Sequence, residues 1–220
     1  MKISKTEENY LKAIFSITEK GQSSASTNSI SHQMQTSAAS VTDMVKRLAK
    51  KKLVIHESHK GVHLTESGNQ IATMLVRRHR LWEVFLVEKL NFLWDEVHEI
   101  AEELEHIKSK ELMKRLDDFL GNPKFDPHGD PIPDADGKFA TRAQVSLNEL
   151  EEGEKGVVVG VQESSTPFLK YLNQLGVSLG SEVKVLEKYD YDNSAKILLN
   201  KKSEIVITGK VCQNLFLQKK

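Results

Sequence analysis

Histidines and glutamates recur at helical spacing in residues 79–107, HRLWEVFLVEKLNFLWDEVHEIAEELEHI. His79 and Glu83 are four residues apart, and a second group consists of His98, Glu102, Glu105 and His106. An α-helix turns by about 100° per residue, so the members of the second group fall on one stripe of a helix. Imidazole nitrogens and carboxylate oxygens that converge in this way are ligands for a divalent transition metal. The spacing therefore predicts metal binding.

Each group also has an interpretation without a metal. His79 and Glu83 fall within an apolar helical stripe that contains Leu75, Trp82, Leu86 and Leu90. A buried carboxylate is costly unless it is paired or metal-bound, so this pair is either a metal site or a hydrogen bond in the core. The second group could be a solvated acidic helix face. Two histidines on the same stripe as two glutamates favour the metal.

Composition limits the remaining possibilities. The 220 residues are 28% charged and 39% apolar, which is typical of a soluble globular protein with one large domain or two to three small ones. No apolar run is long enough to span a bilayer, and the N-terminus MKISKTEENY has no signal-peptide core. The single cysteine, Cys212, excludes an intrachain disulfide and is predicted to be a buried core residue. We therefore expect a cytoplasmic protein.

Charge is distributed unevenly, although the formal net charge is zero. Residues 1–76 contain 10 Lys and Arg against 6 Asp and Glu, whereas residues 77–140 contain 10 against 15. A basic first third beside an acidic middle predicts polyanion binding in one part and cation binding in the other.

The basic first third has the pattern of a winged helix-turn-helix. Helical periodicity is expected in residues 6–20, 27–35 and 37–50, and LVIHESHKGVHLT alternates around a Lys60-Gly61 turn like a β-hairpin wing. Short side chains at the start of the third helix can reach base edges, and the cations behind them can contact phosphates. This pattern predicts DNA-binding residues at Ser37, Ser40, Thr42, Asp43, Lys46 and Arg47. The alternative is a small helical bundle with a solvated basic face.

The remainder is predicted to be a helical bundle followed by a β-domain. Three helices are expected at residues 65–90, 94–107 and 109–120, and their apolar faces indicate packing and a dimer interface. The segment PKFDPHGDPIPDADGKF holds four of the five prolines and is predicted to be a linker or extended loop. Short β-like runs then surround one helix near residues 167–175, which favours a small SH3-like β-barrel.

The whole pattern resembles the diphtheria-toxin-repressor and manganese-transport-regulator family of metal-activated transcriptional repressors. The resemblance is carried by TEENYLKAI, SAASVTDMVKRLAKKKLV, HLTESGNQIA, H-x3-E, H-x3-E-x2-EH and GNP…DPHGDPIP, and it covers essentially the whole chain. It implies a multidomain, mainly α fold. The expected domains are a winged helix-turn-helix at 1–64, a helical dimerisation and metal-binding domain at 65–140, and an SH3-like (FeoA-like) domain at 141–220.

The resemblance also implies two metal sites in each subunit. The primary, activating site falls on Asn9, Glu102, Glu105 and His106. The ancillary site falls on His79, Glu83 and His98, with Glu163 as a further candidate from the β-domain. The family's base-contacting positions fall around Ser37, Ala39, Ser40 and Asp43, which adds Ala39 to the predicted DNA-binding residues. The implied function is repression of metal-uptake genes by a metal-loaded homodimer on palindromic operator DNA, with no enzymatic activity, small-molecule substrate or membrane partner.

Three positions depart from the family pattern. Asn9 stands where methionine or aspartate is usual, so Glu8 is an alternative ligand. Glu102 replaces the cysteine of the iron-responsive branch, and the resulting oxygen-rich set suits Mn²⁺, with Fe²⁺ next. Lys12 stands where short manganese-responsive members carry an acid, which favours two separate sites over a paired-metal site.

Two other functions are compatible with parts of the sequence. His98-Glu99-x-x-Glu102 is close to the H-E-x-x-H zinc signature, so a metallohydrolase is one alternative. A DNA-binding protein with a purely structural metal is the other.

Overall fold

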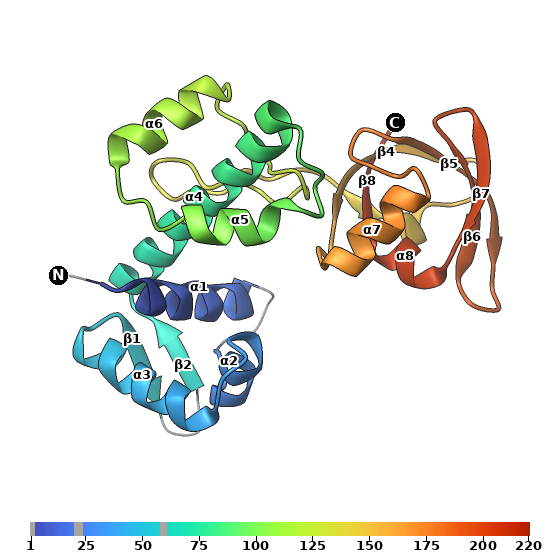
Figure 1. Ribbon diagram of the computed structural model, residues 1–220. Coiled ribbons are helices and arrows are strands. Elements are labelled where there is room, and N and C mark those ends of the chain that lie inside the picture. The colour runs from blue at the N-terminus through green and yellow to red at the C-terminus, as the bar shows by residue number, and fades with distance from the viewer. Residues whose placement is uncertain (1–2, 20–23, 58–60) are drawn as a thin grey trace. The chain divides into compact units, whose positions relative to one another are not determined.

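The computed structural model describes residues 3–19, 24–57 and 61–220. Figure 1 labels the helices and strands of the chain, which forms two compact units. The first unit comprises Met1–His79, Leu104–Lys108 and Pro133–Lys138, and the second comprises Arg80–Glu103, Ser109–Ile132 and Phe139–Lys220. No helix in the described part of the chain is long and apolar enough to cross a membrane.

The first unit contains the predicted winged helix-turn-helix. Its elements are α1 (Lys5–Glu19), α2 (Thr27–Gln33), α3 (Ala38–Lys50), β1 (Val54–Glu57), β2 (Gly61–Leu64) and the first part of α4 (Glu66–Leu90). Ser26 and Ser37 cap α2 and α3 by accepting hydrogen bonds from the backbone N–H groups of Ser29 and Ser40. Leu11, Ile30 and Leu48 are fully buried and hold the three helices together.

Strands β1 and β2 pair antiparallel from Val54↔Leu64 to Glu57↔Gly61, which confirms the hairpin. Lys60 of the predicted turn lies outside the described residues, as do the end of the predicted first helix at Lys20 and residues 21–23 of the loop after it. Gly68 lies so close to this hairpin that an added Cβ would be 1.9 Å from the Leu53 carbonyl oxygen. A glycine is therefore required where α4 begins, one turn after its Thr65 cap.

The second unit contains the remainder of α4 together with α5 (Val97–Leu104) and α6 (Lys110–Phe119). Helix α6 agrees with the predicted range and is capped by Ser109. The prediction for α5, residues 94–107, is wrong at both ends. The Trp94 carbonyl accepts a hydrogen bond from a side chain, and the Ile107 N–H bonds to the Leu104 carbonyl in a tight turn that ends the helix.

The proline-rich connector between α6 and β3 (Val145–Ser146) is a loop, as predicted, but one with buried side chains. It has no helix or regular strand among its described residues, but Asp126 and His128 are buried. The Asp126 carboxylate accepts hydrogen bonds from the backbone N–H groups of His128 and Asp130, at 2.8 and 3.0 Å, which fixes the turn. Gly129, at φ 90°, lies against Gly160, where an added Cβ would meet the Gly160 Cα at 2.3 Å.

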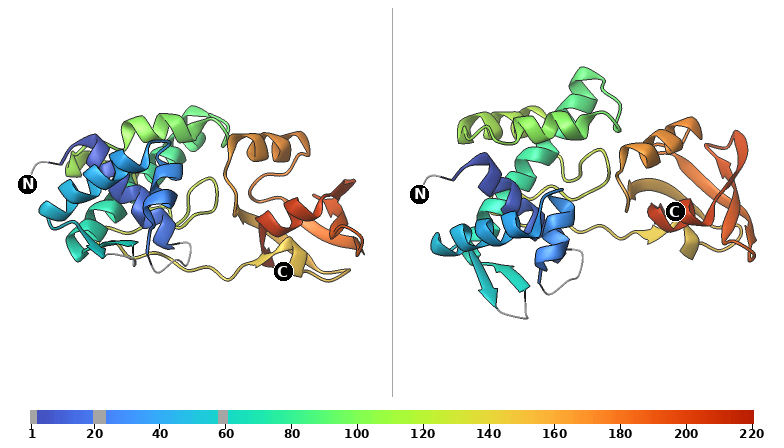
Figure 2. Two further views of the ribbon diagram at one scale, coloured as in Figure 1. Left: turned by 90° about the horizontal axis from the view of Figure 1, so that it is seen from below. Right: turned by 60° about the horizontal axis from the view of Figure 1, so that its bottom comes forward.

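The C-terminal part is a six-stranded antiparallel sheet in the order β3-β8-β4-β5-β6-β7. Its remaining strands are β4 (Lys155–Val161), β5 (Glu182–Tyr189), β6 (Ser194–Leu199), β7 (Ser203–Ile207) and β8 (Leu215–Lys219). Helices α7 (Thr166–Gln174) and α8 (Gly209–Asn214) lie beside the sheet (Figure 2) and contribute Leu169, Leu172 and Val211 to its core. Cys212 is buried there as predicted, and burial raises the pKa of its thiol to about 11. Strands β3 and β8 and helix α8 were not predicted from the sequence.

Candidate metal centre and nucleic-acid surface

Glu105 is the centre of a polar cluster in the first unit. It is the first residue after α5, and its side chain is fully buried. Its Oε2 atom accepts hydrogen bonds from the Lys12 ammonium at 2.6 Å and from the His79 Nδ1–H at 2.7 Å. Its Oε1 atom is buried without a hydrogen-bond partner among the residues that the structure describes. This carboxylate therefore has one oxygen held by Lys12 and His79 and the other available to a ligand.

His106 presents a nitrogen to that available oxygen. Its Nδ1–H donates to Glu8 Oε2 at 2.9 Å, and its Nε2 lies 3.9 Å from Glu105 Oε1. Divalent metals bind such nitrogen and oxygen atoms at about 2.0–2.2 Å, so both atoms can reach one ion. Metal-binding histidines usually donate their second N–H to a carboxylate, which is the role that Glu8 has here. The residues present thus fit a divalent metal.

Asn9 adds a further donor atom to this surface of α1. Its Oδ1 is buried and has no hydrogen-bond partner among the described residues. Glu8, the alternative ligand, is already paired: besides accepting from His106, it forms ion pairs with Lys108 at 3.0 Å and with Arg78 at 3.8 Å. These contacts favour Asn9 as the ligand and Glu8 as the residue that orients His106.

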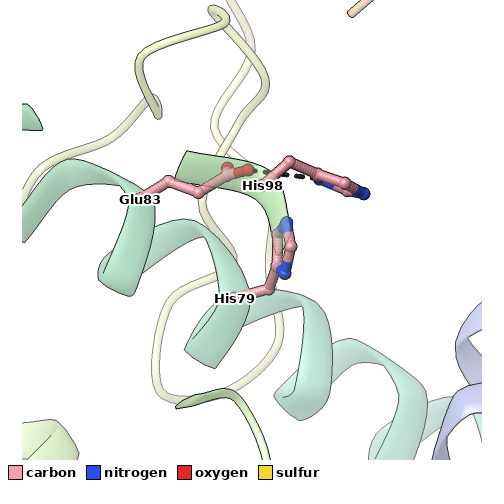
Figure 3. A group of neighbouring side chains, drawn as sticks. All are labelled: His79, Glu83 and His98. Atoms are coloured by element: carbon pink, nitrogen blue, oxygen red, sulfur yellow. Dashed lines mark ion pairs between the residues drawn. The ribbon is translucent and has the colours of Figure 1, made fainter. Parts of the chain in front are cut away.

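The second cluster lies in the second unit around Glu83, whose side chain is 2% exposed. His98 Nδ1 is 3.5 Å from Glu83 Oε1, and His98 Nε2 is 3.7 Å from Glu102 Oε1 one turn further along α5. Figure 3 shows the Glu83–His98 ion pair and, on the preceding turn of α4, His79. His79 and Glu83 are both buried, in agreement with their predicted position in an apolar stripe.

The connector supplies two buried partners that the sequence did not reveal. His128 Nδ1 lies 3.6 Å from Glu83 Oε2, and each of Glu83, Asp126 and His128 offers a ligand atom within 4.8 Å of the others. Burial alone would lower the pKa of His128, but the Glu83 carboxylate raises it to about 9, so the ring is an imidazolium at neutral pH. Arg80 lies 3.4 Å from Asp126 Oδ2. This group is therefore neutralised by its own cations.

His128 also connects Glu83 to the β-domain within the same unit. Its Nε2–H donates to the Trp94 carbonyl at 2.8 Å, and the two rings stack with centroids 6.4 Å apart. The Trp94 indole N–H donates to Asn173 Oδ1 at 2.7 Å, and the Asn173 amide donates to Asp95 Oδ1 at 2.8 Å. Since Asn173 belongs to α7, this chain of hydrogen bonds joins the turn before α5 to the C-terminal domain.

Glu163, the predicted ligand from the β-domain, has partners within that domain. Its carboxylate accepts a hydrogen bond from Ser165 at 2.6 Å and lies 3.4 Å from Lys210. It belongs to none of the groups of three or more candidate metal ligands that the described residues form.

The predicted DNA-binding residues form one exposed surface of α3. Its members are exposed apart from the half-buried Thr42: Ser37, Ala39, Ser40, Thr42, Asp43, Lys46 and Arg47. Behind this surface, buried Glu7 of α1 accepts a hydrogen bond from Lys51 at Oε2, at 2.8 Å, and its Oε1 lies 3.9 Å from Arg47. Consecutive residues of α1, Glu7 and Glu8, thus contact the end of the recognition helix and the His106 cluster, respectively.

Sequence reasoning missed Glu7, Asp126 and His128. The one available signal for the connector was chemical: DPHGD places two acids and a histidine within five residues of an otherwise proline-rich loop. Glu7 had no such signal, because acids in the first turn of a helix are common for reasons of the helix dipole alone.

Three family models match consecutive segments of the chain. Residues 2–62 match the N-terminal DNA-binding domain of iron-dependent repressors, residues 65–134 match their metal-binding and dimerisation domain, and residues 145–219 match the FeoA domain. The iron-dependent repressor IdeR of Mycobacterium leprae (strain TN) is 32% identical over 161 residues, which are 70% of each chain. The diphtheria toxin repressor of Corynebacterium diphtheriae is 31% identical over 131 residues, covering 60% of this chain and 58% of the relative.

Solved structures agree with these sequence matches. A manganese-dependent transcriptional repressor in complex with manganese has a TM-score of 0.85 and 35% identity, covering 97% of this chain and 99% of the other. The manganese regulator SloR has a TM-score of 0.73 and 34% identity over 97% and 98% of the two chains. ScaR with bound Zn²⁺ has a TM-score of 0.74 and 32% identity over 97% and 99%.

Proposed function

The chain belongs to the iron-dependent repressor family of metal-dependent transcriptional repressors, and we propose that Mn²⁺ bound at Glu105 controls its affinity for operator DNA. The relatives described above are repressors rather than enzymes, which argues against a metallohydrolase built on His98, Glu99 and Glu102.

One observation carries the proposal: the open Oε1 of Glu105 faces Nε2 of His106, whose other nitrogen is held by Glu8. The proposed primary ligands are Asn9, Glu105 and His106, with Glu102 as the fourth. Carboxylate and amide oxygens with one imidazole suit Mn²⁺, and Fe²⁺ nearly as well. The bound metal would add its positive charge to that of Lys12 at this carboxylate. It would also link α1, through Asn9, to residues 104–108, through Glu105 and His106.

We propose His79, Glu83 and His98 as the ancillary site, which gives two sites in each subunit. Glu163 remains a predicted additional ligand, although its carboxylate contacts Ser165 and Lys210. The three-domain division, with boundaries after residues 64 and 140, also remains a prediction.

The proposed mechanism acts through α1. Asn9 and Glu8 lie on α1 beside the metal ligands, and Glu7 on the same helix holds Lys51 at the end of α3. A metal that fixes α1 would therefore fix the recognition helix. We propose that the protein binds a palindromic operator as a homodimer, because two recognition helices must be held at the half-site spacing. Exposed apolar side chains of the second unit offer a dimer surface: Leu90, Phe92, Leu93, Leu112 and Phe119.

The test is operator binding measured by fluorescence anisotropy with and without Mn²⁺, Fe²⁺ or Zn²⁺. Salt must be fixed, because phosphate contacts make the affinity salt-dependent. We expect at least about 100-fold tighter binding with metal, which is within the range of allosteric coupling. Equal affinity of the apo-protein would contradict the proposal and leave a DNA-binding protein with a purely structural metal.

A matched pair of variants locates the DNA surface. Lys46→Ala on exposed α3 should weaken binding to all sequences and reduce the salt slope by about one, as loss of one phosphate contact predicts. Lys114→Ala on α6 removes an equally exposed lysine and should leave the salt slope unchanged.

A further inference from the structure

The Lys12 ammonium lies inside the cluster that contains the proposed metal ligands. Lys12 is on α1, and its Nζ is 2.6 Å from Glu105 Oε2 and 3.2 Å from His79 Nδ1. Its side chain is 17% exposed, and that of Glu105 is not exposed at all. The lysine therefore brings a positive charge to a carboxylate that water does not reach.

We propose that Lys12 is a built-in competing cation that weakens metal binding and so sets the metal concentration at which the protein responds. The inference rests on the proposed function, because it assigns the metal to Glu105. It adds a residue that determines affinity without being a ligand.

The physical reason is that one carboxylate would serve two cations. Lys12 takes Oε2, and the open oxygen, Oε1, belongs to the same negatively charged group. A divalent ion on Oε1 would share that single charge with the ammonium, and the two cations would repel each other. Screening is weak at a buried site, so this repulsion reduces the affinity substantially. Without metal, the same ammonium stabilises the buried Glu105.

Two neighbouring cations, Arg78 and Lys108, form ion pairs with Glu8. Arg78 and Lys108 lie 3.8 and 3.0 Å from Glu8 Oε1, and Glu8 orients His106 in the proposed site. Arg78 also donates to Glu105, but to its backbone carbonyl, whereas Lys12 donates to the carboxylate that is the proposed ligand.

The test is a direct Mn²⁺ titration of Lys12→Met, in which electron paramagnetic resonance measures free Mn²⁺. Loss of the charge should tighten Mn²⁺ binding at least about tenfold, the equivalent of roughly 1.4 kcal/mol. The melting temperature of the apo-protein should fall, and saturating Mn²⁺ should restore most of the loss. Lys114→Met, which removes the Lys114–Asp118 pair on the exposed face of α6, is the matched control and should change neither quantity.

Two further variants keep the test decisive if apo Lys12→Met does not fold. Lys12→Gln keeps a hydrogen-bond donor but no charge and should also tighten binding, whereas Lys12→Arg keeps the charge and should bind Mn²⁺ like the unchanged protein. Unchanged or weaker binding in Lys12→Met and Lys12→Gln would overturn the inference and make Lys12 a residue that only holds Glu105 in place. If Mn²⁺ does not change the operator affinity of the unchanged protein, the proposed function is contradicted instead. That conclusion does not depend on the Mn²⁺ affinities of the Lys12 variants.

Discussion

Glu105 in the first unit and Glu83 in the second are similar in burial and different in their connections. The Glu105 side chain is fully buried and that of Glu83 is 2% exposed, and each faces a cation from a distant part of the sequence. For Glu105 the cation is Lys12 of α1, and for Glu83 it is His128 of the connector. Each carboxylate is thus compensated by a side chain of its own unit.

The difference lies in what each cation is attached to. Lys12 belongs to the helix that also carries Glu7, the partner of Lys51 beside the DNA-binding surface. His128 leads through Trp94 to Asn173 on α7 of the β-domain. We therefore expect a change of charge at Glu105 to act on the DNA-binding part, and a change at Glu83 to act on the attachment of the C-terminal domain. We infer that the first carboxylate is the switch and the second a structural support.

The largest effect is expected from Glu105→Gln, which preserves shape but removes the charge. Mn²⁺ affinity should fall by at least about 100-fold, more than the loss of a supporting group would cause. Metal-dependent operator binding, followed by anisotropy, should then be lost.

Glu83→Gln is the matched variant of the other cluster and should weaken Mn²⁺ binding while operator binding still responds to metal. If Glu83→Gln abolished the response and Glu105→Gln did not, the assignment of switch and support would be reversed.

A smaller effect, on stability, is expected from His128→Phe. The ring volume is retained, but Glu83 loses its imidazolium partner, and breaking a buried ion pair by removing one member costs about 3 kcal/mol. Denaturant unfolding of the apo-protein should show this loss, and Mn²⁺ should reduce it by neutralising Glu83. His32→Phe, at an exposed position of α2, should have little effect on unfolding. If Mn²⁺ does not reduce the loss of stability in His128→Phe, then His128 and the proposed metal site at Glu83 are not energetically coupled.

The smallest effect is expected from Asn173→Ala, which removes the hydrogen bonds to Trp94 and Asp95. The free energy of unfolding should fall by about 1–2 kcal/mol, and the fluorescence of Trp94, recorded in a Trp82→Phe background, should shift. Mn²⁺ affinity should not change if Glu105 is independent of the β-domain. Gln174→Ala, at the adjacent exposed position of α7, is the control. A large loss of Mn²⁺ affinity in Asn173→Ala would remove the distinction between the two clusters.

Local pattern was sufficient to predict most elements. The helix-turn-helix, the hairpin, α4, α6 and the four strands β4 to β7 follow from periodicity and capping residues that act over a few positions. Strands β3 and β8 were missed because one has two residues and the other, LFLQK, lacks strict alternation. Helix α5 was predicted too long because its ends depend on contacts with other segments, such as that between His128 and the Trp94 carbonyl.

The sequence predicted which residue types and positions could bind a metal, but not which of these side chains would contact one another. Helical spacing singled out Glu105 and His106, yet both lie just after α5 rather than on it. Lys12 and Glu105 are 93 positions apart, and nothing in the spacing of either residue indicates that they meet. His128 was hidden by the prolines around it, which indicate a loop but not that the loop is buried. Ion pairs between residues far apart in the chain are therefore the feature of the site that local sequence patterns could not predict.

The close approach of Gly129 to Gly160 has a genetic consequence. An added Cβ at Gly129 would meet backbone of β4 at 2.3 Å, whereas one at Gly160 would meet the His128 carbonyl oxygen at 3.2 Å. A selection for loss-of-repression alleles should therefore recover Gly129 substitutions with severe phenotypes and Gly160 substitutions with milder ones. Both would displace His128, the partner of Glu83, and would act through loss of folding stability rather than through the proposed switch at Glu105.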